Sequence, residues 1–338
     1  MKHKKGAGMK HRNWLREFVL GFACCSMLMV FSVSAFAADA YPSKSIRLVV
    51  GFAAGSTPDI IARLVTPGLS ERLGRQVVVE NRAGDGGTIG AEVVARSAPD
   101  GYTIGTISDS FLFKPALGEK LPFDTVKAFT PISLLGFGWN VLAVHPSVPA
   151  KNVQEFIALL KQKPGELICM ASGNASVSHM VSELFKLKTG TNFKTLQFQG
   201  SGPGVIDLVG GHCHFGFISL TTAKSNADAG KLRLLAVMGS ERSPLTPDVP
   251  IISEVGVPGV MVDNWWGLVA PSGLPQPILD RLGRDLKVVL EDPKTKEAFL
   301  KAAAVPVYNT PKELGDYIVS EIAQWTDVAK AAGMKIER

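Results

Sequence analysis

The chain has 338 residues, with 36 Lys and Arg against 30 Asp and Glu, and 46% of its residues are hydrophobic. Six of the basic residues but only one acidic residue lie in the first 37 positions, so the remainder carries a net charge of about +1. A charge so near zero gives no electrostatic case for a nucleic-acid partner and no reason to expect binding to a membrane surface. The roughly 300 remaining residues exceed what one simple core needs and indicate two lobes.

Residues 1–37 are predicted to be a signal peptide. A basic start is followed by an almost wholly apolar run from Phe18 to Phe36, and Ala35-Phe36-Ala37 has the small-x-small pattern of a cleavage site. The apolar run is also long enough for an uncleaved anchor, but the cleavage pattern favours removal near Ala37. We therefore expect an exported, periplasmic protein. An oxidising compartment permits a disulfide between Cys169 and Cys213, but both lie in strand-like runs where bridging would strain a parallel sheet, which favours buried free thiols.

The first predicted strand-turn-helix unit lies at Ile46–Arg63. An apolar, β-branched run to Val50 indicates a buried strand, and the small residues 51–56 form a turn. Thr57 is predicted to cap the following helix, with Pro58 at its first position and Asp59 in its first turn. Such a turn presents free N–H groups and the positive end of a helix dipole to an anion. The alternative is an ordinary βα turn in which Gly55 only provides the geometry.

Two further βα units are predicted to extend this sheet. The strands are expected at Gln76–Glu80 and Tyr102–Ile107, the second ending at Ser108, with a helix over Ala91–Ser97 between them. Gly84, Gly86 and Gly90 miss the G-x-G-x-x-G spacing by one residue, which disfavours a dinucleotide cofactor. Short connections between successive βα units predict a parallel sheet flanked by helices.

Two apolar stretches with strand character, Phe129–His145 and Asp263–Pro271, are predicted to cross between the lobes. We therefore expect lobe I to comprise residues 38–141 plus 265–338, and lobe II to comprise residues 142–264. Amphipathic helices are expected near the C-terminus at 274–290, 294–303 and 311–332.

Lobe II is predicted to repeat the opening design. After a helix at Val153–Leu160, a strand at Glu166–Met170 leads into a small polar loop and then a helix that includes Glu183. The remaining predicted elements of this lobe are strands at 195–198, 213–219 and 233–238 and a helix at 205–209. Two anion-receptive turns in two lobes are the arrangement expected of a protein that binds a ligand between them.

Seven ordered blocks are spread along the chain after the signal peptide, and the similarity that they carry covers essentially all of it. They are FAAGSTPDIIAR, ENRAGDGGTIGAEVVA, APDGYTIG, ASGNASVSHM, GSGPGVIDLVGG, KLRLLAVMGSERSPLTPDVPIISEVGVPGV and WWGLVAPSGLP. Together they resemble the periplasmic solute-binding proteins of tripartite tricarboxylate transporters, the Bug-type receptors. The resemblance implies an α/β, two-lobed periplasmic-binding-protein fold (type II-like), each lobe a mainly parallel sheet flanked by helices.

The resemblance also implies a function. Such receptors bind a small carboxylate through backbone amides, small hydroxyls and ordered water at two βα turns, and deliver it to membrane subunits of the transporter. We expect a monomer without catalytic residues, cofactor or metal. Ser56 stands where the family usually has a second glycine, and Ala175 also replaces a glycine, so the identity of the ligand does not carry over from a relative.

The candidate ligand-binding residues gather at the predicted turns. They are Phe52, Ala54, Gly55, Ser56, Thr57, Asp59, Ser108, Ser172, Gly173, Asn174, Ser176, His179, Gly200 and Ser201. Asp59 either orients ligand or only complements the helix dipole, and the serines either bind ligand or cap helices. His179 is favoured as an anchor of its helix, and Trp265 and Trp266 are favoured as packing residues.

Two other functional classes remain open. An exported serine hydrolase would use Ser176 or Ser178 with His179, although no G-x-S-x-G motif is present. A ligand-sensing partner of a membrane receptor kinase would have the same lobes, and the sequence does not separate it from a transport receptor. His212-Cys213-His214 suggests a metal site only weakly, because no fourth ligand is evident.

Overall fold

The computed structural model describes residues 41–173, 176–198 and 200–333. The predicted signal peptide, Asn174 and Ala175 lie outside these residues. All helices and strands given below belong to one compact unit, Lys44–Arg338.

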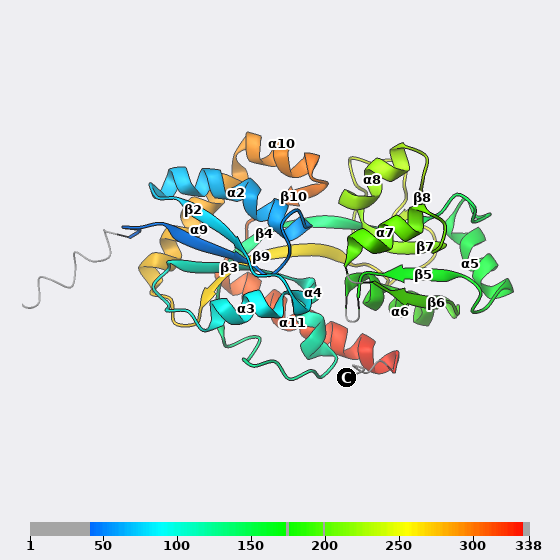
Figure 1. The fold of residues 1–338 in the computed structure, drawn as a ribbon, viewed down its shortest axis with the longest axis horizontal. Coiled ribbons are helices and arrows are strands. Elements are labelled where there is room, and N and C mark those ends of the chain that lie inside the picture. Colours follow the sequence, from blue (N-terminus) through cyan, green and yellow to red (C-terminus); the bar gives the residue numbers. More distant parts are fainter. Residues whose placement is uncertain (1–40, 174–175, 199, 334–338) are drawn as a thin grey trace, which may run out of the picture. The chain divides into compact units, whose positions relative to one another are not determined.

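The described residues form a mixed sheet of ten strands, in the order β2-β1-β3-β9-β4-β7-β5-β6, with β8 and β10 also paired to β4 (Figure 1). The strands are β1 (Ile46–Val50), β2 (Val77–Asn81), β3 (Thr103–Ser108), β4 (Phe129–Val144), β5 (Ile168–Ala171), β6 (Lys194–Gln197), β7 (Phe215–Ser219), β8 (Arg233–Val237), β9 (Asp263–Pro271) and β10 (Ala304–Pro306). Strands β2, β1 and β3 run parallel to one another, as do β6, β5 and β7. The two predicted groups of parallel strands are therefore present.

Two long strands join these groups. β4 has 16 residues and β9 has nine, and they pair antiparallel to each other. β9 also pairs with β3, while the second half of β4 pairs with β7 and β8. Most residues of both strands are buried, which explains why the sequence shows continuous apolar runs. The prediction that both stretches are strands is confirmed.

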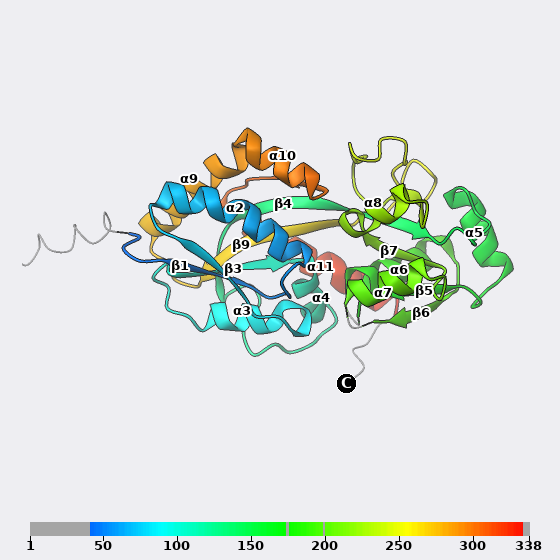
Figure 2. The same ribbon diagram turned by 45° about the horizontal axis from the view of Figure 1, so that its top comes forward.

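Helices cover both faces of the sheet. They are α2 (Thr57–Leu73), α3 (Thr88–Ala95), α4 (Asp109–Ala116), α5 (Val153–Gln162), α6 (Val177–Thr189), α7 (Ser201–Val209), α8 (Leu220–Asp228), α9 (Gln276–Glu291), α10 (Pro293–Lys301) and α11 (Pro311–Ala331), with a 3₁₀ turn at Asp85–Gly87. Figures 1 and 2 show α2, α9 and α10 on one face of β1, β3 and β9, and α3, α4 and α11 on the other. The parallel strands therefore have helices on both sides, as their apolar sequences require.

One core cluster extends beyond the second group of strands. It contains Phe156 and Phe185 from α5 and α6, together with Phe113 of α4 and Trp325 of α11. The rings of Phe113 and Trp325 lie edge to face, with their centroids 4.9 Å apart. Helices that begin beside the first group of strands thus also pack against the second, and the exact lobe boundaries remain a prediction.

Several predicted elements need correction. Helices α4 and α8 and strand β10 were not predicted, α3 begins at Thr88 rather than Ala91, and α7 begins at Ser201 rather than Val205. β7 begins at Phe215, because Cys213 lies in the turn that precedes it. Cys169 and Cys213 are buried free thiols, as predicted. No helix among the described residues is long and apolar enough to cross a membrane.

Candidate functional site

The turn after β1 leads directly into helix α2, as predicted, but the helix cap is one residue earlier than expected. Ser56 is the N-cap and Thr57 is the first helical residue. The Ser56 hydroxyl makes no capping hydrogen bond, and its Oγ is buried without a partner among the described residues. Gly55 has φ +79°, a left-handed conformation that glycine adopts without strain.

Asp59 stabilises this turn from inside. The residue is 2% exposed, and its carboxylate accepts hydrogen bonds from the Gly55 amide (2.9 Å), Arg63 Nε (3.0 Å) and Asn81 Nδ2 (2.8 Å). Burial alone would raise the pKa of Asp59, but hydrogen bonds from Arg63, Gly55 and Asn81 outweigh it and hold the pKa below its usual value. The amide of Gly55, predicted to be free for an anion, is therefore already bonded.

The loop after β2 lies directly against the turn after β1. A Cβ built on Gly51 would be 2.7 Å from the carbonyl oxygen of Gly87, and one built on Gly90 would be 2.5 Å from Gly51 Cα. The Phe52 ring lies against Gly87, where an added Cβ would be 3.1 Å from it. The start of α3 is therefore part of the same site.

Four hydroxyl oxygens around these loops are buried and have no hydrogen-bond partner among the described residues. They belong to Ser56, Thr88, Thr106 and Ser108. Thr106 is opposite Val50 in the β1–β3 register, and Ser108 ends β3 and is the N-cap of α4. Buried hydroxyls without partners are uncommon, because each loses its hydrogen bonds to water. Thr88 and Thr106 were missed by sequence reasoning, for which the available signal was that Thr88 begins a helix and Thr106 lies two residues before the end of β3.

The second predicted turn follows β5 and contains a serine cluster centred on Ser178. The Ser178 hydroxyl accepts from the Ser172 amide (2.8 Å) and lies 3.1 Å from Ser172 Oγ and 3.0 Å from Ser176 Oγ. Ser176 is the N-cap of α6, and its hydroxyl also accepts from the His179 amide at 3.3 Å. Burial lowers the pKa of the His179 ring. The Ser178 hydroxyl can thus donate to one of the two neighbouring hydroxyls while it accepts from the Ser172 amide.

We expect Ser178→Ala to lower the free energy of unfolding by about 1–3 kcal/mol. The substitution leaves the Ser172 amide without its acceptor and removes the partner of two hydroxyls, and a buried unsatisfied donor costs about that much. Urea denaturation measures the change. Ser320→Ala is the control, because the exposed Ser320 hydroxyl donates only to the Tyr317 carbonyl oxygen within its own helix. Equal stability of both variants would contradict this assignment.

The remaining predicted residues divide between the two turns. Ala54 is exposed and Thr57 is half-buried in the first turn. In the second, the Gly200 amide donates to the Ser172 carbonyl oxygen at 3.0 Å, and an added Cβ on Gly173 would lie 3.5 Å from the Phe198 carbonyl oxygen. Ser201 begins α7. Asn174 lies outside the described residues, and the assignment of ligand contacts to these residues remains a prediction.

The tryptophans are packing residues, as favoured from the sequence. Trp265 is fully buried and Trp266 is 3% exposed, both within β9. His214 is also engaged structurally, because its Nδ1 accepts from the Ile168 amide at 3.0 Å. Among the described residues, no group of three or more His, Cys, Asp and Glu side chains could hold a metal ion.

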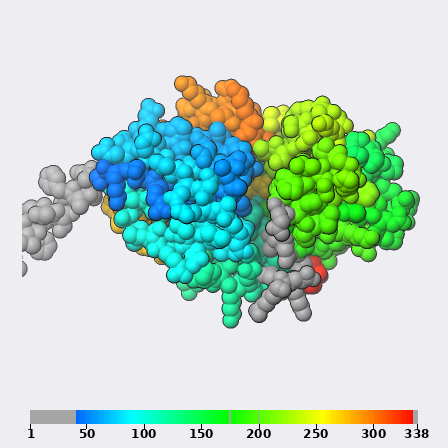
Figure 3. All heavy atoms as spheres, viewed as in Figure 1, coloured from blue at the N-terminus to red at the C-terminus, as the bar shows by residue number. Residues whose placement is uncertain are grey.

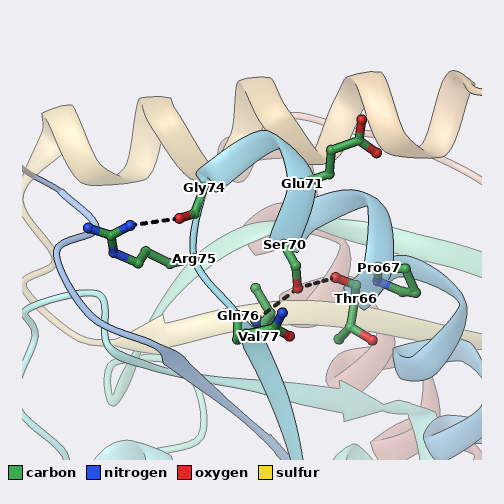
Figure 4. A pocket seen from close by; sticks show the side chains of 8 residues that line it. All are labelled: Thr66, Pro67, Ser70, Glu71, Gly74, Arg75, Gln76 and Val77. Carbon is green, nitrogen blue, oxygen red and sulfur yellow. Dashed lines mark hydrogen bonds between the residues drawn. The ribbon is translucent and has the colours of Figure 1, made fainter.

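A surface hollow lies away from both turns. It lies at the C-terminal end of α2 and the start of β2, around Ser70, Gly74 and Val77 (Figure 4). Ser70 Oγ accepts from the Val77 amide and donates to the Thr66 carbonyl oxygen there, so this hydroxyl is used within the protein. In the space-filling view, the surface of segments before β4, blue and cyan, adjoins the green surface of segments after it (Figure 3).

The fold and the two turns define a solute-binding protein of the periplasmic-binding-protein class. Residues 61–334 match the tripartite tricarboxylate transporter family receptor, and the chain belongs to that family. Protein BugT of Bordetella pertussis is 34% identical over 302 residues, which is 89% of this chain and 93% of BugT. The predicted family resemblance is confirmed.

Solved structures agree with this assignment. The structure of R. palustris Rpa4515 with adipate has 33% identity and a TM-score of 0.81, and the match covers 87% of this chain and 99% of that one. The periplasmic binding protein BugD has 31% identity and a TM-score of 0.79, with 88% and 100% coverage. The predicted two-lobed periplasmic-binding-protein fold is confirmed.

Proposed function

We propose that this protein is an exported receptor that binds a small carboxylate between its two lobes and delivers it to the membrane subunits of a tripartite tricarboxylate transporter. The observation that carries the proposal is the group of buried hydroxyls without partners at Ser56, Thr88, Thr106 and Ser108. A ligand carboxylate, directly or through water, would accept the hydrogen bonds that these groups do not make within the protein.

Neutral hydrogen-bond donors, rather than cationic side chains, would bind the carboxylate of the ligand. Three cations near the first turn are already paired: Arg63 with Asp59, Lys114 with Asp85 and Glu119, and Arg82 with Glu80. Hydroxyls and the N-terminal ends of α2, α3 and α4 remain, and helix N-termini favour anions. The adipate bound by the relative Rpa4515 supports a dicarboxylate as the first class to test.

Closure would occur by a hinge motion of the two crossing strands near Leu142 and Gly267. β4 has a register shift between Leu142 and Ala143 in its pairing with β8, and such irregularities interrupt a regular ladder. We retain lobe I as residues 38–141 plus 265–338 and lobe II as residues 142–264. Delivery to membrane subunits as a periplasmic monomer belongs to the same proposal.

The hydrolase alternative has weaker support. The Ser176 hydroxyl accepts from the His179 backbone amide and lies 3.0 Å from Ser178 Oγ, which is typical of a helix cap. Loss of ester turnover in a Ser176→Ala variant would favour the hydrolase. A sensory role would instead be indicated by ligand-dependent capture of a receptor kinase's periplasmic domain.

Calorimetry with succinate, malate, glutarate and adipate tests the receptor proposal. We expect saturable binding of at least one, with stabilisation of about 2.7 kcal/mol at a concentration 100 times its dissociation constant. The diamide of adipate is the control, because it has the same chain length without the charge. Absence of heat and of thermal shift with every dicarboxylate would contradict the proposal.

Gly55→Val is expected to weaken binding at least tenfold, or about 1.4 kcal/mol. Space is not the reason, because a Cβ at Gly55 would meet nothing within 4 Å. The reason is the φ of +79°, which a β-branched residue resists, so the turn changes and the Gly55–Asp59 hydrogen bond is lost. Gly74→Val is the control, because Gly74 also has a positive φ, +67°, but lies at the far end of α2. It should introduce similar backbone strain without weakening ligand binding. Unchanged affinity in Gly55→Val would place the site elsewhere.

A further inference from the structure

The loop between β2 and α3 has an unusual backbone. Gly84, Asp85, Gly86 and Gly87 all have positive φ, at 141°, 53°, 65° and 98°. The three glycines adopt such angles without a side-chain clash. Asp85 adopts one at a steric cost, because it has a Cβ. Asp85 and Ala303 are the non-glycine residues with positive φ in the described part of the chain.

This loop determines where two elements of the proposed site lie. It ends at Thr88, whose buried hydroxyl has no partner among the described residues. It also touches the first turn, because Gly87 packs against both Gly51 and the Phe52 ring. A shift of the loop would therefore move the unpartnered Thr88 hydroxyl and the neighbouring turn together.

Lys114 of α4 holds the loop from the other side. Its Nζ pairs with Asp85 Oδ1 and lies 3.2 Å from Glu119 Oε1, while its side chain is only 13% exposed. A Cβ on Gly86 would lie 3.8 Å from Lys114 Cε and 4.0 Å from the Ser110 carbonyl oxygen. The ion pair thus connects the loop after β2 to the helix that follows β3.

We propose that the Asp85–Lys114 pair is a positioning device for ligand: it fixes the loop Gly84–Thr88 before binding and so raises the affinity of the first turn for a carboxylate. This inference rests on the proposed function. Holding a loop in its bound conformation increases affinity because less conformational entropy is lost on binding. The pair also explains why an aspartate occupies a left-handed position where a glycine would be unstrained.

Two measurements separate this inference from the proposed function. Hydrogen exchange of the amides at residues 84–88 needs no ligand, and Lys114→Met and Asp85→Asn should each accelerate it at least tenfold. Asparagine tolerates the left-handed region, so Asp85→Asn removes charge with little added strain. Calorimetry with succinate, malate, glutarate and adipate should then show a three- to tenfold larger dissociation constant in each variant. The double variant should lose no further affinity.

The controls address a merely structural role. Glu119→Gln removes the other carboxylate beside Lys114 and should leave both exchange and affinity near the wild-type values. Lys114→Arg, unlike Lys114→Met, should keep both the exchange rate and the affinity near the wild-type values, since it keeps the charge. Unchanged exchange in Lys114→Met, or equal effects of Glu119→Gln and Asp85→Asn, would overturn the positioning role. If the wild-type chain binds none of the four dicarboxylates, the proposed function fails and the affinity role fails with it.

Discussion

Replacing Asp109 with asparagine is expected to stabilise the protein at pH 8 and to change its stability little at pH 4. Asp109 is 4% exposed at the start of α4. Its Oδ1 accepts from the Ser110 amide at 2.6 Å, but its Oδ2 is buried without a partner among the described residues. Burial, with a contribution from the nearby charge of Glu321, raises the pKa of Asp109 to about 7.

The surroundings of Asp109 offer acidic neighbours. Glu321 on α11 has a pKa raised by burial, although its Oε2 accepts from the indole N–H groups of Trp325 (3.2 Å) and Trp265 (3.4 Å). Burial also raises the pKa of Asp263, at the start of β9, to about 6. Ionising all three carboxyls together would place three negative charges near one another, so the cluster titrates as a coupled group.

The sign of the pH dependence follows from proton binding. Between pH 4 and pH 7 the folded protein keeps a proton on Asp109 that the unfolded chain loses, so the stability contributed by this group falls across that range and the loss is complete above about pH 7. Asparagine does not titrate and should remove this loss, while its side-chain oxygen still accepts from Ser110. At about 1.4 kcal/mol for each pKa unit, and with neighbours that also titrate, the gain at pH 8 should be of order 2–4 kcal/mol.

Urea denaturation at pH 4, 6 and 8, followed by tryptophan fluorescence, measures the effect. Asp285→Asn is the control, because Asp285 is also buried but pairs with Arg281 (2.6 Å) and Arg72 (3.2 Å). That variant should lose stability at pH 8, since two arginines lose their partner. A loss of stability at pH 8 in Asp109→Asn would show that its carboxylate is compensated in the folded protein.

The strands of this fold were predictable because burial on both faces leaves a continuous apolar run. The structure gives β9 the predicted bounds, Asp263–Pro271, and shifts β3 by one residue at each end. Helix α4 was not predicted because it has eight residues, three of them consecutive Phe, Leu and Phe, and Pro115 near its end. Such a segment is too short and too apolar to show a helical period.

The candidate site was only partly predictable, because its polar groups find their partners across the fold. Asp59 was evident as a first-turn acid, but its bond from Asn81 depends on how α2 packs against β2. Likewise, a sequence does not distinguish a hydroxyl that is buried without a partner, as in Thr106, from one that is solvated. The sequence alone indicated where the turns lie. Only the structure shows which of their hydroxyls have no hydrogen-bond partner.

Gly90→Ala is expected to destabilise the protein by at least about 2 kcal/mol and to weaken dicarboxylate binding at least tenfold. Alanine normally favours a helix over glycine by about 1 kcal/mol, and Gly90 lies within α3. Here, however, the added Cβ would lie 2.5 Å from Gly51 Cα, 2.9 Å from Gly51 N and 3.3 Å from the Arg82 carbonyl oxygen. All three are backbone atoms, so no side-chain rotation relieves the overlap.

The clash must instead push α3 away from the turn after β1. That movement separates Gly87 from Gly51 and so disrupts the first turn as a binding surface, in addition to its cost in packing. Chemical denaturation and calorimetry with the same four dicarboxylates measure the two effects.

Gly315→Ala is the matched control, since Gly315 also lies inside a helix, α11, but its added Cβ would meet only Pro131 Cγ at an ordinary 3.6 Å. The control should keep full affinity and be no less stable than wild type, because helix propensity then acts without a clash. If Gly90→Ala behaves like Gly315→Ala, then the close approach of the two loops does not position the ligand.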